Sequence, residues 1–203
     1  MLAFERCGIG TPSLLFVHGF GCAREDWWAQ VEQFSGEHDC VAVDLPGFGQ
    51  SHPLASEISM SAFADAIREV MDSEGIEQAV LFGHSMGCRP IVELSIAAPD
   101  RVAGLVLVDP GRASVDYEAS KAQFKALIEE RGFPNHARAM FANMFFDPKY
   151  DALRDRLAVR GAAVPADVAV ATYLAMLDWD ANRCEAVFDA VSVPVMVLQS
   201  TTR

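Results

Sequence analysis

The stretch Gly83-His84-Ser85-Met86-Gly87 constrains the fold of this chain more than any other feature of its sequence. It follows a short apolar run from Ala79 to Phe82, which is typical of a buried parallel strand, and it precedes residues 88–98, whose apolar positions predict a helix. A serine on such a sharp strand-to-helix turn must adopt a strained backbone, and the flanking glycines remove side chains that would clash there. The helix N-terminus behind the turn favours developing negative charge. The pattern predicts a nucleophilic Ser85; the alternative interpretation is an ordinary glycine-rich β–α turn.

Short apolar strands alternate with helices along most of the chain. The predicted strands lie at residues 2–6, 13–17, 40–43, 79–82, 102–108 and 193–198, and the predicted helices at 26–34, 59–74 and 88–98. This alternation favours an α/β fold, with a mostly parallel sheet and helices on both of its faces. Residues 1–113 are predicted to form the core, and residues 182–203 to return to it with the last strand.

The stretch from residue 114 to residue 181 breaks the alternation. Its pattern is helical throughout, at residues 117–131, 136–146, 149–160 and 165–179, with breaks at Gly132-Phe133-Pro134, Asp147-Pro148 and Gly161. We expect a helical lid (cap) subdomain inserted between two strands, with most apolar side chains in the core of the lid. Others should line a substrate pocket, and the candidates are His18, Met140, Met144, Phe145 and Trp179.

A second motif lies near the N-terminus. The apolar strand Ser13–Val17 runs directly into His18-Gly19-Phe20-Gly21. An acyl-transfer site needs two backbone N–H groups that point at the developing oxyanion. The residue after the nucleophile, Met86, is the first candidate donor, and Phe20 in this loop is the second. His18 is expected to hold the loop through hydrogen bonds.

Taken together, these motifs resemble the α/β-hydrolase family, in its esterase-like branch with a lid over the active site. The matching segments occur in the family's order and cover nearly the whole chain: residues 18–21, 44–51, 83–87, 105–109 and 193–198. The resemblance implies ester hydrolysis through an acyl-enzyme at Ser85. Relatives with serine at this position include carboxylesterases, carbon–carbon bond hydrolases and cofactor-independent perhydrolases. Haloalkane dehalogenases and epoxide hydrolases use aspartate there, so Ser85 argues against both.

The general base of the family has no counterpart in chain order. The triad runs serine, then aspartate or glutamate, then histidine, but the last histidine of this chain is His136. The simplest interpretation is that the chain lacks the C-terminal part that carries the catalytic histidine. His18, His52, His84 and His136 remain alternatives, subject to geometry. Asp109, at the end of a strand, is an alternative acid but is expected to hold the turn that follows it.

The composition limits the classes of partner that we expect for this protein. The net charge of −12 argues against nucleic acid and anionic membranes, which both reward basic patches. We find no positively charged signal-peptide start and no apolar run of membrane-spanning length. The five scattered cysteines show no metal-ligand spacing and are typical of reduced thiols in a cytoplasmic protein. We expect neither a metal nor a cofactor.

The sequence therefore predicts a serine hydrolase that acts on small esters with an apolar acyl or aromatic group. The alternatives are a catalytically incomplete or inactive pocket-binding protein of the same fold, and a carbon–carbon bond hydrolase or perhydrolase. The apolar strand from Val193 to Leu198 is expected to leave an unpaired edge of the sheet. A second copy of the chain, or a partner segment, is expected to cover it.

Overall fold

The computed structural model describes residues 1–112, 114–145 and 147–200. Its centre is a six-stranded sheet in the order β1-β3-β2-β4-β5-β6. The strands are β1 (Phe4–Cys7), β2 (Ser13–Val17), β3 (Cys40–Val43), β4 (Ala79–His84), β5 (Val102–Val108) and β6 (Val195–Leu198). Only the pairing of β1 with β3 is antiparallel among these strands. The predicted mostly parallel sheet is confirmed.

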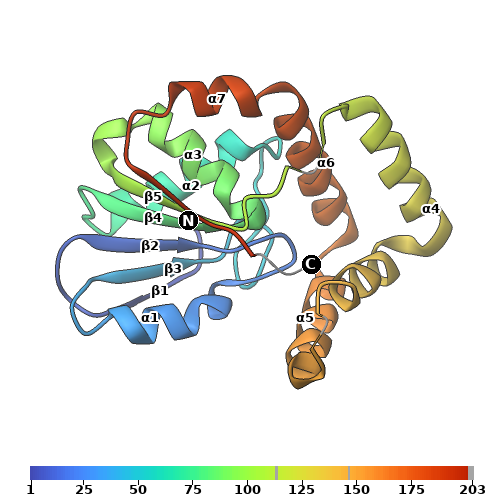
Figure 1. Ribbon diagram of the computed structural model, residues 1–203, viewed down its shortest axis with the longest axis horizontal. Coiled ribbons are helices and arrows are strands. Elements are labelled where there is room, and N and C mark those ends of the chain that lie inside the picture. Colours follow the sequence, from blue (N-terminus) through green and yellow to red (C-terminus); the bar gives the residue numbers. More distant parts are fainter. Residues whose placement is uncertain (113, 146, 201–203) are drawn as a thin grey trace.

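Helices pack on both faces of the sheet, as predicted (Figure 1). One face carries α2 (Met60–Ser73), α3 (Cys88–Ala97) and α7 (Cys184–Ala190), and the opposite face carries α1 (Trp28–Phe34). Helix α2 begins where the Ser59 hydroxyl accepts a hydrogen bond of 3.0 Å from the Ala62 N–H, which satisfies one of the free donors of its first turn. Its apolar side contributes Phe63, Ile67, Val70 and Met71 to the main core.

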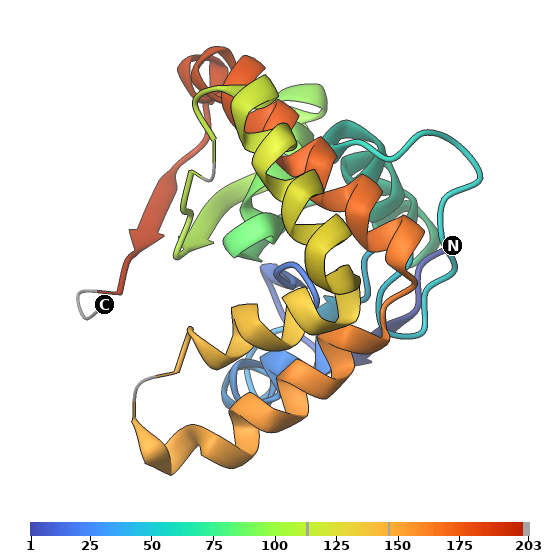
Figure 2. The ribbon, with the colours of Figure 1, turned by 90° about the vertical axis from the view of Figure 1, so that its right-hand side faces the viewer.

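The segment between β5 and β6 lies past the carboxyl ends of the parallel strands (Figures 1 and 2). It carries α4 (Tyr117–Ala142), α5 (Asp151–Ala163) and α6 (Ala166–Asn182) before it returns through α7. We refer to α4, α5 and α6 as the lid. Among the described residues, no single helix is long and apolar enough to cross a membrane; α5 with its short preceding turn and α6 reach that length only together, across a bend of 101°.

The lid confirms one predicted break and differs from the prediction at another glycine. The helices expected at 117–131 and 136–146 are the two parts of α4, which meet at a kink where the φ of Gly132 is +73° and the backbone is not helical; position 146 lies outside the described residues. Gly161 was expected to end a helix but lies inside α5. There a Cβ would sit 2.3 Å from the ring of Phe141, so this glycine permits close helix packing instead of a break. Outside the lid, helix α7 was not predicted.

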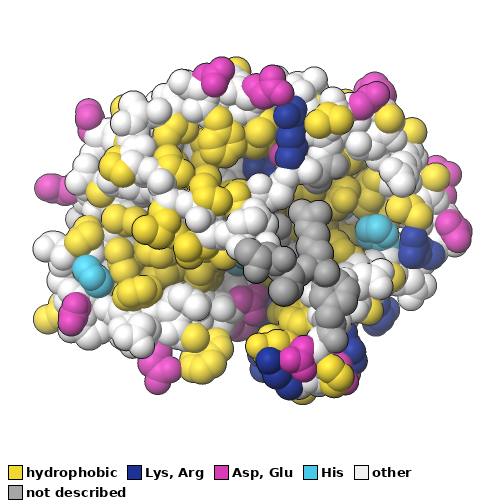
Figure 3. All heavy atoms as spheres, viewed as in Figure 1, with side chains coloured by type: hydrophobic (Ala, Val, Ile, Leu, Met, Phe, Trp, Pro, Cys, Tyr) yellow, Lys and Arg dark blue, Asp and Glu magenta, His cyan; other side chains and the backbone are white. Residues whose placement is uncertain are grey.

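The face of the sheet beside α1 is only partly covered. Trp27 packs against Phe16 there, with ring centroids 5.3 Å apart, but α1 does not reach β5 and β6 (Figure 1). Val80, Phe82 and Val108 remain half-buried on this face. The side chains of β6 are 45–58% exposed. Figure 3 shows the resulting gathering of hydrophobic side chains between α1 and α7.

Candidate active site

Ser85 occupies the turn between β4 and α3. Its φ is +49°, in the left-handed region that residues with a side chain rarely adopt. The two flanking glycines permit the turn by their lack of a side chain. A Cβ on Gly83 would lie 2.6 Å from the Gly87 carbonyl oxygen, and one on Gly87 would lie 2.5 Å from that of Val17. Strain of this kind persists only where the surrounding structure enforces it and is common at functional sites.

The loop after β2 approaches the same turn. A Cβ on Gly19 would lie 2.9 Å from Nδ1 of His84, so only glycine allows the loop to come this close. The ring of Phe20 is buried in edge-on contacts with Phe48, Phe133 and Tyr173, the last two from the lid. Within the described residues, the Phe20 N–H has no hydrogen-bond acceptor. It is therefore free to donate to a bound group.

His18 is held in one neutral form. Its Nε2 accepts a hydrogen bond of 2.9 Å from the Leu45 N–H, so the ring proton lies on Nδ1, which donates to the Gly19 carbonyl oxygen at 2.7 Å. Burial lowers the pKa of His18 to about 4. Both ring nitrogens are therefore occupied, and His18 holds the loop, as expected, and is unsuited to the role of a general base.

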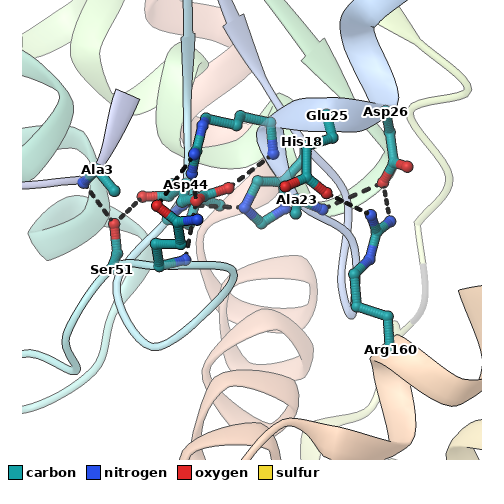
Figure 4. A network of polar contacts seen from close by, with 11 residues as sticks. Ala3, His18, Ala23, Glu25, Asp26, Asp44, Ser51 and Arg160 are labelled. Atoms are coloured by element: carbon teal, nitrogen blue, oxygen red, sulfur yellow. Dashed lines mark hydrogen bonds and ion pairs between the residues drawn. The ribbon is translucent and has the colours of Figure 1, made fainter. Parts of the chain in front are cut away.

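Asp44 connects two loops at the foot of the site (Figure 4). Its carboxylate is fully buried and accepts hydrogen bonds from the Arg24 N–H at 2.7 Å and the Gln50 N–H at 2.9 Å. The Arg24 guanidinium neutralises the buried charge. On the other side, the Ser51 hydroxyl donates to the Asp44 carbonyl oxygen and accepts from the Ala3 N–H. Asp44 is thus a structural brace for the loops.

A buried ion pair lies behind the turn that carries Ser85. Arg89 of α3 makes two hydrogen bonds of 2.7 Å to the Asp180 carboxylate of α6. The same guanidinium donates to the carbonyl oxygens of Ser85 at 3.1 Å and Gly111 at 2.8 Å. Arg89 therefore fixes the backbone of Ser85 and joins it to the lid. The chain pattern offered no signal for this pairing, because its partners are 91 positions apart.

Trp179, a candidate for substrate contact, lies next to this ion pair. Its indole N–H donates to the buried Glu93 carboxylate at 2.6 Å, and Arg183 binds the same carboxylate. Trp179 lines a hollow of about 30 Å³ together with Cys88 and Arg89. The structure places this side chain of α6 against α3, where it packs the lid on that helix.

A larger cavity of about 280 Å³ opens between α1, α5 and the edge of the sheet where the parallel strands have their carboxyl ends. His84, the residue before Ser85, lines this cavity. Ser85 itself is not among the described residues that line it. The lid contributes Leu153, Arg156 and Leu157, which the sequence analysis did not select. Their position on one side of α5 was the only available signal, and apolar stripes of this kind usually form core.

The other lining candidates occupy different positions. His18 lines the cavity from the core. Met140 is half-buried between the main core and a small cluster of Cys22, Phe141 and Leu157. Phe145 packs on that cluster, and Met144 is 56% exposed. Their contact with a substrate remains a prediction.

Burial shifts the pKa of four other side chains near the site. It lowers the pKa of His84 and His136, and it raises the pKa of the Cys22 and Cys88 thiols to about 12. Asp109, with a φ of +46°, accepts hydrogen bonds from the Gln199 side chain and the Ser200 N–H. In the described part of the chain, no side chain is hydrogen-bonded to the Ser85 hydroxyl, and no cluster of three or more His, Cys, Asp or Glu residues could hold a metal ion.

Known proteins show the same architecture. A carboxylesterase of Bacillus subtilis, YbfK, is 31% identical over 130 residues, which are 63% of this chain and 44% of that protein. The dihydrolipoyllysine-residue acetyltransferase component of the acetoin cleaving system of Cupriavidus necator is 37% identical over 107 residues, 53% of this chain and 29% of that protein. The matched segments thus span less than half of both curated relatives.

Among solved structures, a thermophilic esterase from Thermogutta terrifontis superimposes with a TM-score of 0.81 at 26% identity. The match covers 97% of this chain and 73% of the esterase. A family model described as alpha/beta hydrolase fold matches residues 12–202. Because this match covers most of the chain, the chain belongs to the alpha/beta hydrolase fold family.

Proposed function

We propose that this protein is a serine hydrolase that cleaves small carboxylic esters through an acyl-enzyme at Ser85. The observation that carries the proposal is the backbone of Ser85, held at a φ of +49° by two glycines that contact neighbouring backbone. A strained serine at the carboxyl edge of a parallel sheet presents its Oγ to a ligand. The relatives support ester chemistry by their names, a carboxylesterase and an esterase.

The proposed chemistry assigns a role to each group. Ser85 Oγ attacks the ester carbonyl carbon and gives up its proton to a general base, and the resulting oxyanion accepts hydrogen bonds from the N–H groups of Phe20 and Met86. The C–O bond to the alcohol then breaks, the alcohol takes up a proton, and water hydrolyses the acyl-enzyme. The apolar lining from Leu153 and Leu157 favours an apolar acyl or aromatic group.

The base is the weakest part of the assembly. His18 is committed to two backbone groups, and in the described residues no other histidine is bonded to Ser85. A serine without a base is a weak nucleophile at neutral pH. This favours a second candidate function, a catalytically incomplete protein that retains the pocket and binds the same class of ligand.

One experiment separates the two candidates. The parent, Ser85→Ala and the exposed control Ser61→Ala are compared in hydrolysis of p-nitrophenyl acetate and butyrate between pH 7 and 9, and in labelling by a fluorophosphonate. A serine hydrolase is expected to lose turnover and label only in Ser85→Ala. Hydrolysis by Ser85→Ala at the parent rate would show that the site is wrong. A parent that is neither active nor labelled supports the binding protein.

A further inference from the structure

Helix α5 of the lid sits directly on the loop that carries Phe20. Gly21, with a φ of +70°, faces the ring of Phe141 and the backbone of Gly161. A Cβ on Gly21 would lie 3.1 Å from that ring and 3.5 Å from the Gly161 Cα. The Phe141 ring and the Gly161 backbone of the lid therefore lie directly against the backbone of the loop. A small displacement of α5 must change the position of the loop, because close-packed groups leave no empty space between them.

An ionic contact joins α5 to the turn after this loop at Arg160, the residue directly before Gly161 (Figure 4). The Arg160 guanidinium binds Oδ2 of Asp26, and it lies 3.6 Å from the Glu25 carboxylate. The same oxygen of Asp26 accepts a hydrogen bond of 3.1 Å from the Ala23 N–H. The Asp26 N–H in turn donates to the Ala23 carbonyl oxygen at 3.0 Å. One carboxylate oxygen thus connects the lid to the turn that follows Phe20.

We propose that Arg160 is a positioning residue, which shapes the oxyanion hole through Asp26 and couples docking of α5 to the conformation of the loop from Gly19 to Ala23. The proposal rests on the proposed function for the role of the Phe20 N–H. From Asp26 the chain leads back through Ala23 and Cys22 to a tight turn. This turn is closed by a hydrogen bond of 3.2 Å from the Cys22 N–H to the Gly19 carbonyl oxygen. Phe20 lies inside that turn, so holding Ala23 holds Phe20.

The coupling must also act in reverse. If the lid stabilises the loop, the loop stabilises the lid by the same free energy. The loss of the Asp26 charge should therefore loosen the end of α5, while an amide oxygen in its place still accepts from the Ala23 N–H. A contact that only adds to overall stability does not produce this reciprocal and local pattern.

Arg154 provides a matched control. It belongs to the same helix, but it binds Asp151 and Asp155 of α5 itself at 2.6 and 2.9 Å. Its removal costs the helix an exposed ionic contact without touching the loop. The variants are Arg160→Met, Arg160→Lys, Asp26→Asn and Arg154→Met, each compared with the parent.

Hydrogen–deuterium exchange of the full chain, followed by mass spectrometry, tests the coupling without need of turnover. In Arg160→Met, exchange across residues 19–24 is expected to rise about tenfold, the range for one part-exposed charge-assisted hydrogen bond, while peptides of β4 keep the parent rate. Arg160→Lys should show a smaller rise, and Asp26→Asn should accelerate exchange at residues 158–163. An unchanged loop in Arg160→Met, or an equal rise in Arg154→Met, would overturn the proposal.

Ester kinetics then address the role in the oxyanion hole. Because the hole acts in the transition state, Arg160→Met is expected to lower kcat on p-nitrophenyl acetate about tenfold with an unchanged KM, whereas Arg154→Met keeps both values. A raised KM at parent kcat would contradict a positioning role. If Ser85→Ala shows that the hydrolase proposal is wrong, the exchange data still decide whether the lid and the loop are coupled. The coupling would also be contradicted if Arg160→Met lost protection from exchange across the whole chain while the loop in Arg160→Lys exchanged at the parent rate.

Discussion

His18 shows how one residue at the carboxyl edge of the sheet is fixed by the backbone on both sides of its ring. The Leu45 N–H and the Gly19 carbonyl oxygen select the neutral imidazole with its proton on Nδ1. Protonation of Nε2 would place two donors against each other, and the buried charge would have little water to solvate it. The residue therefore links β2 to the loop after β3 only while it is neutral.

This arrangement predicts a pH dependence of stability. Burial lowers the pKa of His18 to about 4 from an ordinary value of 6.5. The unfolded chain therefore binds a proton at His18 over this range and the folded chain does not, so stability is lost as the pH falls from about 6.5 to about 4. In His18→Asn, the free energy of unfolding should depend less steeply on pH there, by about 1 kcal/mol per pH unit.

Urea denaturation at several pH values measures this slope. His52→Asn, at an exposed position, is the control and should keep the parent slope. His84 and His136 also have lowered pKa values because of burial and contribute in the same direction. The difference between the parent and His18→Asn isolates the contribution of His18. Equal slopes in these two proteins would contradict the neutral tautomer assigned to His18.

At the scale of elements, the C-terminal end of helix α6 is attached to α3 by ion pairs and hydrogen bonds. Asp180 binds Arg89, while Trp179 and Arg183 bind Glu93, so two buried charges of α3 are satisfied by the last turn of α6 and the residue that follows it. A buried ion pair adds little over an apolar pair of similar size, but breaking it leaves an uncompensated charge. The C-terminal part of α6 should therefore be the least mobile part of the lid.

Removal of one partner tests this attachment. Asp180→Ala leaves the Arg89 guanidinium buried and without its main counter-charge, and it is expected to lower the free energy of unfolding by roughly 3–5 kcal/mol. Asp178→Ala, two positions away on the exposed side of α6, is the matched control and should change it by less than about 1 kcal/mol. Urea denaturation compares them. A loss of similar size in both variants would show that the ion pair is not the cause.

The elements that sequence patterns predicted well are those whose neighbours are close along the chain. Strands at 13–17, 40–43 and 102–108 and the helix after Ser59 were found at or within one residue of their expected bounds. The turn at Ser85 could be predicted because the strand, the glycines and the helix adjoin it, while its role as a nucleophile stays a prediction. Gly161 was misread because a glycine that breaks a helix and one that admits a neighbouring ring look alike in sequence. The contacts of Arg89 and Arg160 depend on lid packing, which local patterns do not encode.

At the scale of the whole molecule, the surface combines a large negative net charge with an uncovered apolar face. Helix α1 covers β2 and β3 and reaches Phe82 of β4 through Phe34, with ring centroids 6.3 Å apart. Val108 and Met196 lie on the same face farther along the sheet, where hydrophobic side chains gather at the surface (Figure 3). Strand β6 also forms the edge of the sheet. Exposed apolar edges of this kind favour association. The net charge of −12 opposes it through repulsion between copies.

These opposing effects predict self-association that depends on salt. We expect the 203-residue chain to sediment mainly as a dimer or larger species at high salt, where repulsion is screened, and to shift toward monomer at low salt. Met196→Lys, on a side chain that is 58% exposed on β6, should weaken the association, because it places a charge on the uncovered face. The control Val159→Lys adds the same charge at a side chain that is 64% exposed on α5 and should not. Sedimentation velocity at several concentrations measures the distribution, and a parent that stays monomeric in high salt at the highest concentration would show that this face needs no cover.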